Sequence, residues 1–193
     1  MSQTLKSKID YIRQTLNSDF GMVLSPKWGA SEPNHRLEIR HYLSSQFSSR
    51  FSRQQLSRLN DLNWIPETSD GYICISHCRS TGGFSFAMLK HGFDVEETSR
   101  ISTAILKRTC TADELAECPR TEFLWVAKEA GFKALAAGAS QLLISDLICI
   151  EWKSHFENQV FSFRLKSEKT LDFELNRGFI FLDAEKSFGY FFR

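Results

Sequence analysis

The sequence predicts an α+β fold with largely antiparallel sheets. Two observations support this prediction. Helical and strand patterns both occur without regular alternation, and the second half of the chain is a run of short strands. A chain of 193 residues is long enough for one large domain or two small ones. Its 42% hydrophobic and 24% charged residues are typical of a globular protein.

The first half contains three predicted helices and then three predicted strands. Residues 1–16 form an amphipathic pattern, and residues 37–47 and 52–62 carry apolar side chains at helical spacing. The chain turns around Pro66 and the "TSDG" that follows. The strands are expected at 72–77, 84–89 and 93–96, and we expect the glycines of "CRSTGG" to close the first two into a hairpin.

Three further helices are predicted before the chain changes to strands. One covers 101–108, and the second opens at Thr111, whose spacing to Glu114 is that of a capping box. The longest covers 121–138, with Thr121 as N-cap and Gly138 as its stop. Gly131 inside it costs roughly 1 kcal/mol. The later strands are expected at 142–152, 159–165, 171–175, 178–183 and 190–192.

Composition excludes several classes of protein. The formal net charge is +1, and there is neither a basic block nor a nucleic-acid motif, so nucleic-acid binding is not expected. The N-terminus lacks a signal-peptide pattern, no apolar stretch is long enough for a membrane span, and there is no N-glycosylation sequon. We therefore expect a cytoplasmic protein whose five cysteines stay reduced.

Cys74, His77 and Cys78 lie close enough in sequence to suggest zinc. No second ligand pair stands at a suitable distance, so buried thiols on a strand are the favoured interpretation.

The segment "HGFDVEE" at 91–97 raises a question about charge. Phe93 and Val95 alternate with Asp94 and Glu96, so both carboxylates leave the same face of a strand. Neighbouring like charges repel, and something should compensate for that cost. A solvent-exposed sheet edge is one answer, and a bound cation is the other.

The long helix offers a third carboxylate. Trp125, Glu129 and Lys133 follow at four-residue steps and share one face, which by itself indicates a surface Glu–Lys pair. Together with Asp94 and Glu96, however, Glu129 would complete an oxygen site suited to magnesium. Spacing alone does not show that the helix reaches the strand.

Three sequence blocks together resemble the signature of the 4′-phosphopantetheinyl transferase superfamily. They are "ISH" at 75–77, "GFDVE" at 92–96 and "WVAKEAGFK" at 125–133, and every fixed position of the family pattern is filled. The intervals are also ordinary for the family, with 17 residues from His77 to Asp94 and 35 from Asp94 to Glu129. "RTCTADE" at 108–114 is similar to a less specific family segment.

The resemblance implies a fold and an activity. The length is similar to that of the larger, monomeric type, in which two similar α+β halves form a pseudo-dimer, here 1–90 on the coenzyme A side and 91–193 with the metal and catalytic helix. The implied reaction transfers the phosphopantetheine arm of coenzyme A to a serine of an apo acyl or peptidyl carrier protein and releases 3′,5′-ADP. The implied metal is Mg²⁺, with Mn²⁺ as an alternative.

The resemblance also assigns roles residue by residue. Asp94, Glu96 and Glu129 match the metal ligands, and Glu129 is the candidate base for the serine, either directly or through a water on the metal. Lys133 matches the lysine that contacts the phosphates. Ser76 and His77 match the pair that contacts coenzyme A phosphate. For the 3′-phosphate the match is Arg40, with Arg36 as the alternative.

Two positions depart from the family pattern. Ile65–Pro66 stands where many members have a basic residue before the proline, and Gly131 replaces a bulkier residue in the catalytic helix. The rival interpretations are a degenerate member that binds coenzyme A or a carrier without catalysis and a domain that matches by accident. The sequence does not identify the carrier, but Arg100, Lys107 and Arg108 would give an acidic carrier a basic surface beside Glu96.

Overall fold

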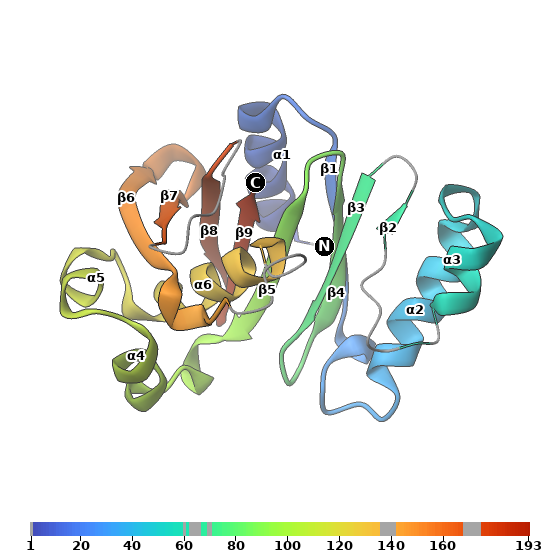
Figure 1. Ribbon diagram of the computed structural model, residues 1–193, viewed down its shortest axis with the longest axis horizontal. Coiled ribbons are helices and arrows are strands. Elements are labelled where there is room, and N and C mark those ends of the chain that lie inside the picture. Colours follow the sequence, from blue (N-terminus) through green and yellow to red (C-terminus); the bar gives the residue numbers. More distant parts are fainter. Residues whose placement is uncertain (1, 60, 62–66, 69–70, 136–141, 168–174) are drawn as a thin grey trace.

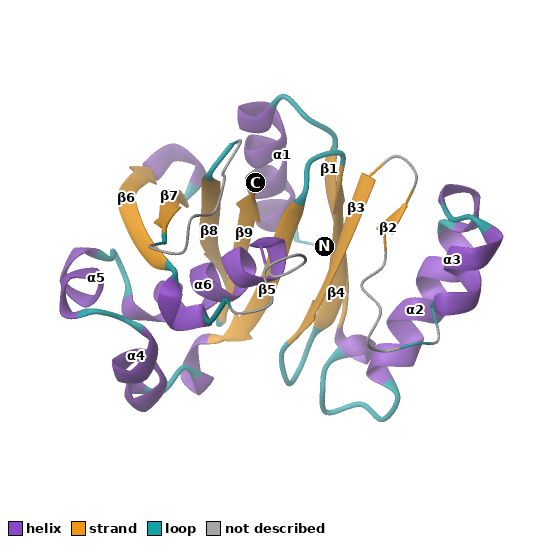
Figure 2. Cartoon of the chain, viewed as in Figure 1, coloured by secondary structure: helices purple, strands orange, loops and turns teal. Residues whose placement is uncertain are grey.

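A computed structural model of the chain describes residues 2–59, 61, 67–68, 71–135, 142–167 and 175–193. The strands form two antiparallel sheets (Figures 1 and 2), which confirms the predicted α+β class. The first sheet has the order β1-β4-β3-β2 and contains Phe20–Ser25, Gly82–Ala87, Gly71–His77 and Glu67–Thr68. The second has the order β5-β9-β8-β7-β6 and contains His91–Glu97, Lys186–Phe192, Arg177–Asp183, Val160–Lys166 and Ile148–His155.

The described residues contain six α-helices and several short 3₁₀ turns. The longest helix is α6, with 15 residues. The α-helices are α1 Gln3–Leu16, α2 His35–Gln46, α3 Arg53–Arg58, α4 Thr103–Thr109, α5 Ala112–Glu117 and α6 Thr121–Leu135. The 3₁₀ turns are η1 Pro26–Trp28, η2 Ser48–Arg50, η3 Thr98–Arg100, η4 Ile144–Asp146 and η5 Phe156–Asn158.

Strand alternation separates two helices onto opposite faces of the five-stranded sheet. In β8, Phe179 and Phe181 belong to the same buried cluster as Ile9 of α1, whereas Ile180 between them packs in the cluster built around α6. The outer face of the four-stranded sheet is covered by α2 and α3, at the right of Figure 1. The two sheets meet where β3 lies against β5.

The predicted hairpin is confirmed, but its glycines do not form the turn. Gly82 and Gly83 are the first two residues of β4, and Gly82 pairs with His77 across the ladder. A side chain at Gly82 would collide with the carbonyl oxygen of Trp28, and one at Gly83 with that of Val23. These glycines therefore permit β1 and the η1 turn that follows it to pack closely against β4.

Several element boundaries differ from the prediction. Residues 142–152 do not form one strand: Asp146 accepts a hydrogen bond from the Leu143 backbone N–H at 2.7 Å, which stabilises a 3₁₀ turn before β6 begins. Thr121 is the first residue of α6 rather than its cap. The strand β1 was not predicted. Gly138 and most of the strand expected at 171–175 lie outside the described residues.

The N-terminal helix packs on the sheet formed by the C-terminal strands. Lys8 of α1 donates a hydrogen bond to the carbonyl oxygen of Leu182 at 2.5 Å. Leu5, Ile9 and Ile12 are buried in the cluster that contains the β9 side chains. The division into similar halves at 1–90 and 91–193 stays a prediction.

Candidate active site

The strand β5 turns two carboxylates toward α6. Phe93 and Val95 are fully buried between the sheets, so Asp94 and Glu96 point to the opposite face, as the alternation predicted. The side chain of Lys133 on α6 reaches Asp94 on this face. Asp94 is only 4% exposed, which excludes the solvent-exposed edge as an explanation for its charge.

Asp94 is the centre of a small polar network. Its Oδ1 lies 2.7 Å from Lys133 Nζ and accepts a hydrogen bond from Ser76 Oγ at 2.8 Å. Lys133 also donates to Ser76 Oγ at 3.0 Å and to the Phe93 carbonyl oxygen at 3.2 Å. The helix therefore does reach the strand, and Lys133 forms its ion pair with Asp94 rather than the expected surface pair with Glu129.

The second carboxylate oxygen of Asp94 is buried without a hydrogen-bond partner in the described part of the chain. An orphaned buried oxygen of this kind is costly, and a bound cation would satisfy it. No group of three or more His, Cys, Asp or Glu side chains among the described residues forms a ready-made metal site. The donor chemistry thus fits a hard cation at Asp94, while its sharing with Glu96 and Glu129 stays a prediction.

Burial and mutual repulsion perturb the neighbouring carboxyl groups. Burial and then the charge of Asp94 raise the pKa of Glu96 to about 7, against the opposing effects of Arg100 and Lys133. The pKa of Glu129 is also raised, first by burial and then by Asp94. Burial lowers the pKa of Lys133, but the nearby anionic groups, Asp94 first among them, outweigh it and the net shift is upward. The three carboxyl groups thus share one electrostatic environment.

A second group of basic side chains lies at the end of β3. The rings of His77 and His35 are in edge-to-face contact with centroids 4.5 Å apart, and Arg36 Nε lies 3.4 Å from His77 Nε2. Burial, then His35 and Arg36, lower the pKa of His77. Ser76, in contrast, is buried and engaged with Asp94, which makes it a residue that positions that carboxylate.

The two candidate arginines on α2 occupy different environments. Arg40 is buried and donates to the carbonyl oxygen of Leu59 at 3.4 Å, whereas Arg36 is exposed beside His77. The family resemblance favoured Arg40, with Arg36 as the alternative, and helical spacing could not show which of the two faces the end of β3. The departure at Ile65–Pro66 lies outside the described residues.

Two interactions lie at the carboxyl end of β5: the first, at Arg100, was expected from the sequence, and the second, at Glu97, was not. Arg100 in η3 lowers the pKa of Glu96 through its charge, which places this guanidinium near the carboxylate cluster. Glu97 Oε1 accepts a hydrogen bond from the Ser80 backbone N–H at 2.9 Å and so ties the β3–β4 turn to β5. Cys74 and Cys78 are buried free thiols, as the favoured interpretation predicted.

Among the described residues, no helix is long and apolar enough to cross a membrane.

Residues 90–181 match the model of the 4′-phosphopantetheinyl transferase superfamily. This region contains Asp94, Glu96, Glu129 and Lys133, and it begins after the Ser76–His77 pair. The search of curated proteins finds no significant match.

Proposed function

We propose that this protein transfers the 4′-phosphopantetheine arm of coenzyme A to a serine of an apo carrier protein. The observation that carries the proposal is the meeting of β5 and α6, where a buried carboxylate with an unsatisfied oxygen lies among two carboxyl groups of raised pKa and a lysine. The same residues fall inside the region that matches the superfamily. In the reaction the serine oxygen bonds to phosphorus, the pyrophosphate P–O bond breaks, and 3′,5′-ADP leaves.

The chain's own residues supply binding and proton transfer. Glu129 is partly buried with a raised pKa, which suits a general base that takes the proton of the serine hydroxyl. Lys133 holds Asp94 in place and offers positive charge to the phosphate oxygens. His77 with Arg36 would bind a further phosphate of coenzyme A, and we prefer Arg36 to the buried Arg40 for this role.

A divalent cation, Mg²⁺ or Mn²⁺, would be held by Asp94 with Glu96 and Glu129. When bound it would neutralise charge on the pyrophosphate. Because cation binding favours ionised carboxylates, its affinity should rise with pH through the range in which Glu96 titrates.

The decisive experiment is incubation with coenzyme A, Mg²⁺ and a panel of apo carriers, followed by intact-mass measurement. Asp94→Asn should abolish transfer, whereas Asp113→Asn, a matched change at an exposed position on α5, should not. A protein that binds coenzyme A but modifies none of the carriers would contradict the proposal and favour a non-catalytic binder.

We further propose that the segment after β5 docks the carrier. Arg100 and Lys107 are exposed, and Arg100 lies near Glu96, so both would meet an acidic helix presented beside the site. Arg100→Glu with Lys107→Glu should raise KM for the carrier and weaken its salt dependence while leaving coenzyme A affinity unchanged. An unchanged carrier KM would place the docking surface elsewhere.

A further inference from the structure

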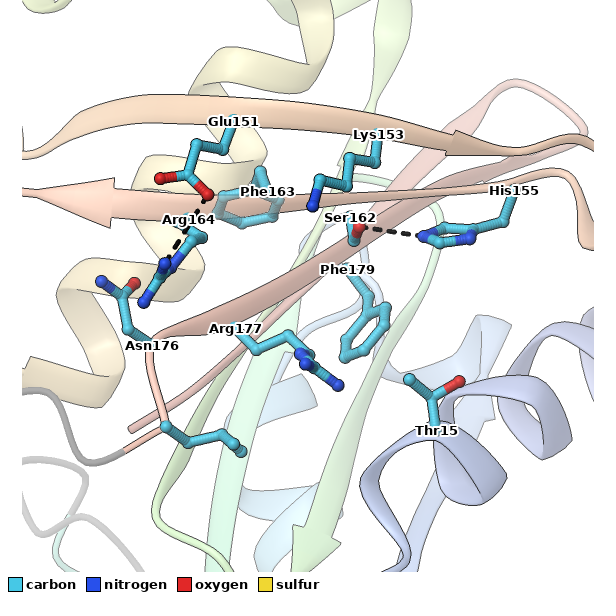
Figure 3. Close-up of a pocket in the computed structure, with 11 residues that line it drawn as sticks. Thr15, Glu151, Lys153, His155, Ser162, Phe163, Arg164, Asn176, Arg177 and Phe179 are labelled. Carbon is cyan, nitrogen blue, oxygen red and sulfur yellow. Dashed lines mark hydrogen bonds and ion pairs between the residues drawn. The ribbon is translucent and has the colours of Figure 1, made fainter.

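A polar cavity lies on the face of the five-stranded sheet opposite α6. Its volume is about 410 Å³, within the range of small-molecule sites. Figure 3 shows its side chains, which come from β6, β7, β8, the two residues before β8 and, at one side, Thr15 near the end of α1. Ser162 pairs with Phe179 in the ladder, and Phe179 belongs to the α1-side cluster, which fixes the face on which the cavity opens.

Three neighbouring strands each contribute a cation to this cavity. Lys153 comes from β6, Arg164 from β7 and Arg177 from β8, and among the described residues that line the cavity Glu151 is the only carboxylate. Lys153 pairs with Ser162, and alternation places Arg164 on the same face as Ser162. Like charges on adjacent strands repel, so their gathering here requires compensation.

The described residues supply little of that compensation. Glu151 lies 3.6 Å from Arg164, and both side chains are about half exposed (50% and 51%). Within the described part of the chain, the side chains of Lys153 and Arg177 form neither an ion pair nor a hydrogen bond. The positive field extends to His155, whose pKa is lowered by burial and then by Lys153 and Arg177.

The cavity also contains neutral hydrogen-bonding groups and an apolar wall. His155 Nε2 and Ser162 Oγ are 2.9 Å apart and are directed toward each other on the sheet surface (Figure 3). The Phe179 ring contributes apolar surface between them and Arg177. Guanidinium and ammonium groups next to a hydroxyl are the donors that phosphate groups prefer.

We propose that this cavity binds the phosphate group of a small phosphorylated molecule, with Lys153 and Arg177 as the charged contacts and Ser162 as a neutral donor. The site is separate from the carboxylate cluster, because it opens on the opposite face of the sheet. The other explanation for a lysine here is that β6 is an edge strand, where lysines prevent edge-to-edge association. That explanation does not cover Arg177 on the interior strand β8.

The test is a titration of the ¹⁵N-labelled full chain with inorganic phosphate at constant ionic strength, followed by residue-resolved NMR. Saturable shifts should appear at the amides of Lys153, Ser162 and Phe179. Arg177→Glu and Lys153→Glu should each weaken binding by about tenfold or more, the usual effect of losing a charged hydrogen bond. Arg53→Glu and Lys6→Glu, at exposed positions outside the cavity, are the matched controls and should leave the affinity unchanged.

Two results would overturn the proposal. One is a set of shifts confined to the His77 and Lys133 region, which would mean that phosphate binds only at the proposed coenzyme A site. The other is an equal loss of affinity in the cavity variants and the controls, which would indicate general charge attraction. Circular dichroism of each variant shows whether a loss of binding comes from unfolding.

Discussion

At the scale of single residues, a substitution of Asp94 should have two opposite effects on stability. Its Oδ1 forms a partly buried ion pair with Lys133, while its Oδ2 has no partner among the described residues. Removal of the carboxylate therefore relieves repulsion with Glu96 but leaves the lysine without its anion. The sequence suggested only the first effect, because the partner of Lys133 is set by the packing of a helix against a strand.

We predict that Lys133→Ala lowers kcat more than it changes coenzyme A affinity. The lysine is placed to act on charge that develops in the transition state, and interactions of that kind act on turnover. Lys128, five residues earlier on α6 and fully buried, belongs to a different network, the ion pair with Glu114. Steady-state kinetics together with direct measurement of coenzyme A binding would check this, and lost binding with unchanged turnover at saturation would contradict it.

His91 provides a prediction about pH. Burial lowers its pKa to about 4, from an ordinary value of 6.5, against its hydrogen bonds to the Leu89 carbonyl and to Ser85. The unfolded chain therefore takes up a proton here before the folded chain does. Stability from this group is complete above pH 6.5 and is lost as pH falls toward 4, on the order of 3 kcal/mol in all.

Urea unfolding at pH 7 and pH 4.5 would measure this loss. The variant His91→Phe with Ser85→Ala removes both the titrating group and the hydroxyl it contacts, so it should lose distinctly less stability on acidification. His41→Gln, at an exposed position on α2, should keep the wild-type dependence. If all three proteins lose the same unfolding free energy between pH 7 and pH 4.5, His91 is not responsible for the loss.

At the scale of elements, glycines of β5, β9 and α6 itself set how closely α6 packs on its sheet. A Cβ at Gly92 would collide with the backbone carbonyl of Ala130, whereas a Cβ at Gly131 would collide with Cδ1 at the end of the Leu165 side chain. Backbone cannot yield without moving the helix, but a side-chain end can rotate. The departure at Gly131 therefore reflects packing against β7 and need not loosen the helix.

We predict that Gly92→Ala destabilises the protein by about 3 kcal/mol or more and also lowers activity, since it displaces α6 from β5. Gly131→Ala should cost less, because its gain in helix propensity of about 1 kcal/mol offsets part of the overpacking. Adding Leu165→Val should restore stability to Gly131→Ala but not to Gly92→Ala. Denaturant unfolding measures all of these, and a mild effect at Gly92 would contradict the prediction.

A buried ion pair fixes α6 to the preceding helices. Lys128 and Glu114 lie 2.8 Å apart with side chains 0% and 1% exposed, and Lys128 also donates to the Thr109 carbonyl oxygen. Lys128→Met leaves a buried carboxylate unpaired and should cost about 3–5 kcal/mol. Arg164→Met breaks the half-exposed pair with Glu151 and should change stability by under about 1 kcal/mol. Similar losses in the two variants would be the contrary result.

The sequence was informative wherever a short local pattern determines structure. Alternation identified β5 and the shared face of Asp94 and Glu96, and the capping box at Thr111 forms as predicted. Local patterns could not show that β1 pairs with β4, because the paired residues are far apart in the chain, from Phe20 with Ala87 to Ser25 with Gly82. For the same reason they could not distinguish Arg36 from Arg40, since only the position of β3 decides which of them lies beside His77.

At the scale of the whole molecule, the two sheets are joined by polar as well as apolar contacts. Ser76 of the first sheet bonds to Asp94 of the second, and Ser85 of the first bonds to His91 of the second. Both contacts lie on β5, so the strand that carries the site carboxylates also holds the sheets together. A change that separates the sheets should therefore disturb the site before it unfolds the chain.

The order of strands in the second sheet has a consequence for synthesis on the ribosome. The hydrogen-bonding partner of β5 is β9, and residues 98–185 lie between them in the chain. Until β9 has left the exit tunnel, β5 has no ladder partner and α1 has no complete surface on which to pack. The aromatic side chains of β5 and α1 therefore stay exposed on the nascent chain for much of translation. We expect chaperones to bind the chain during this period.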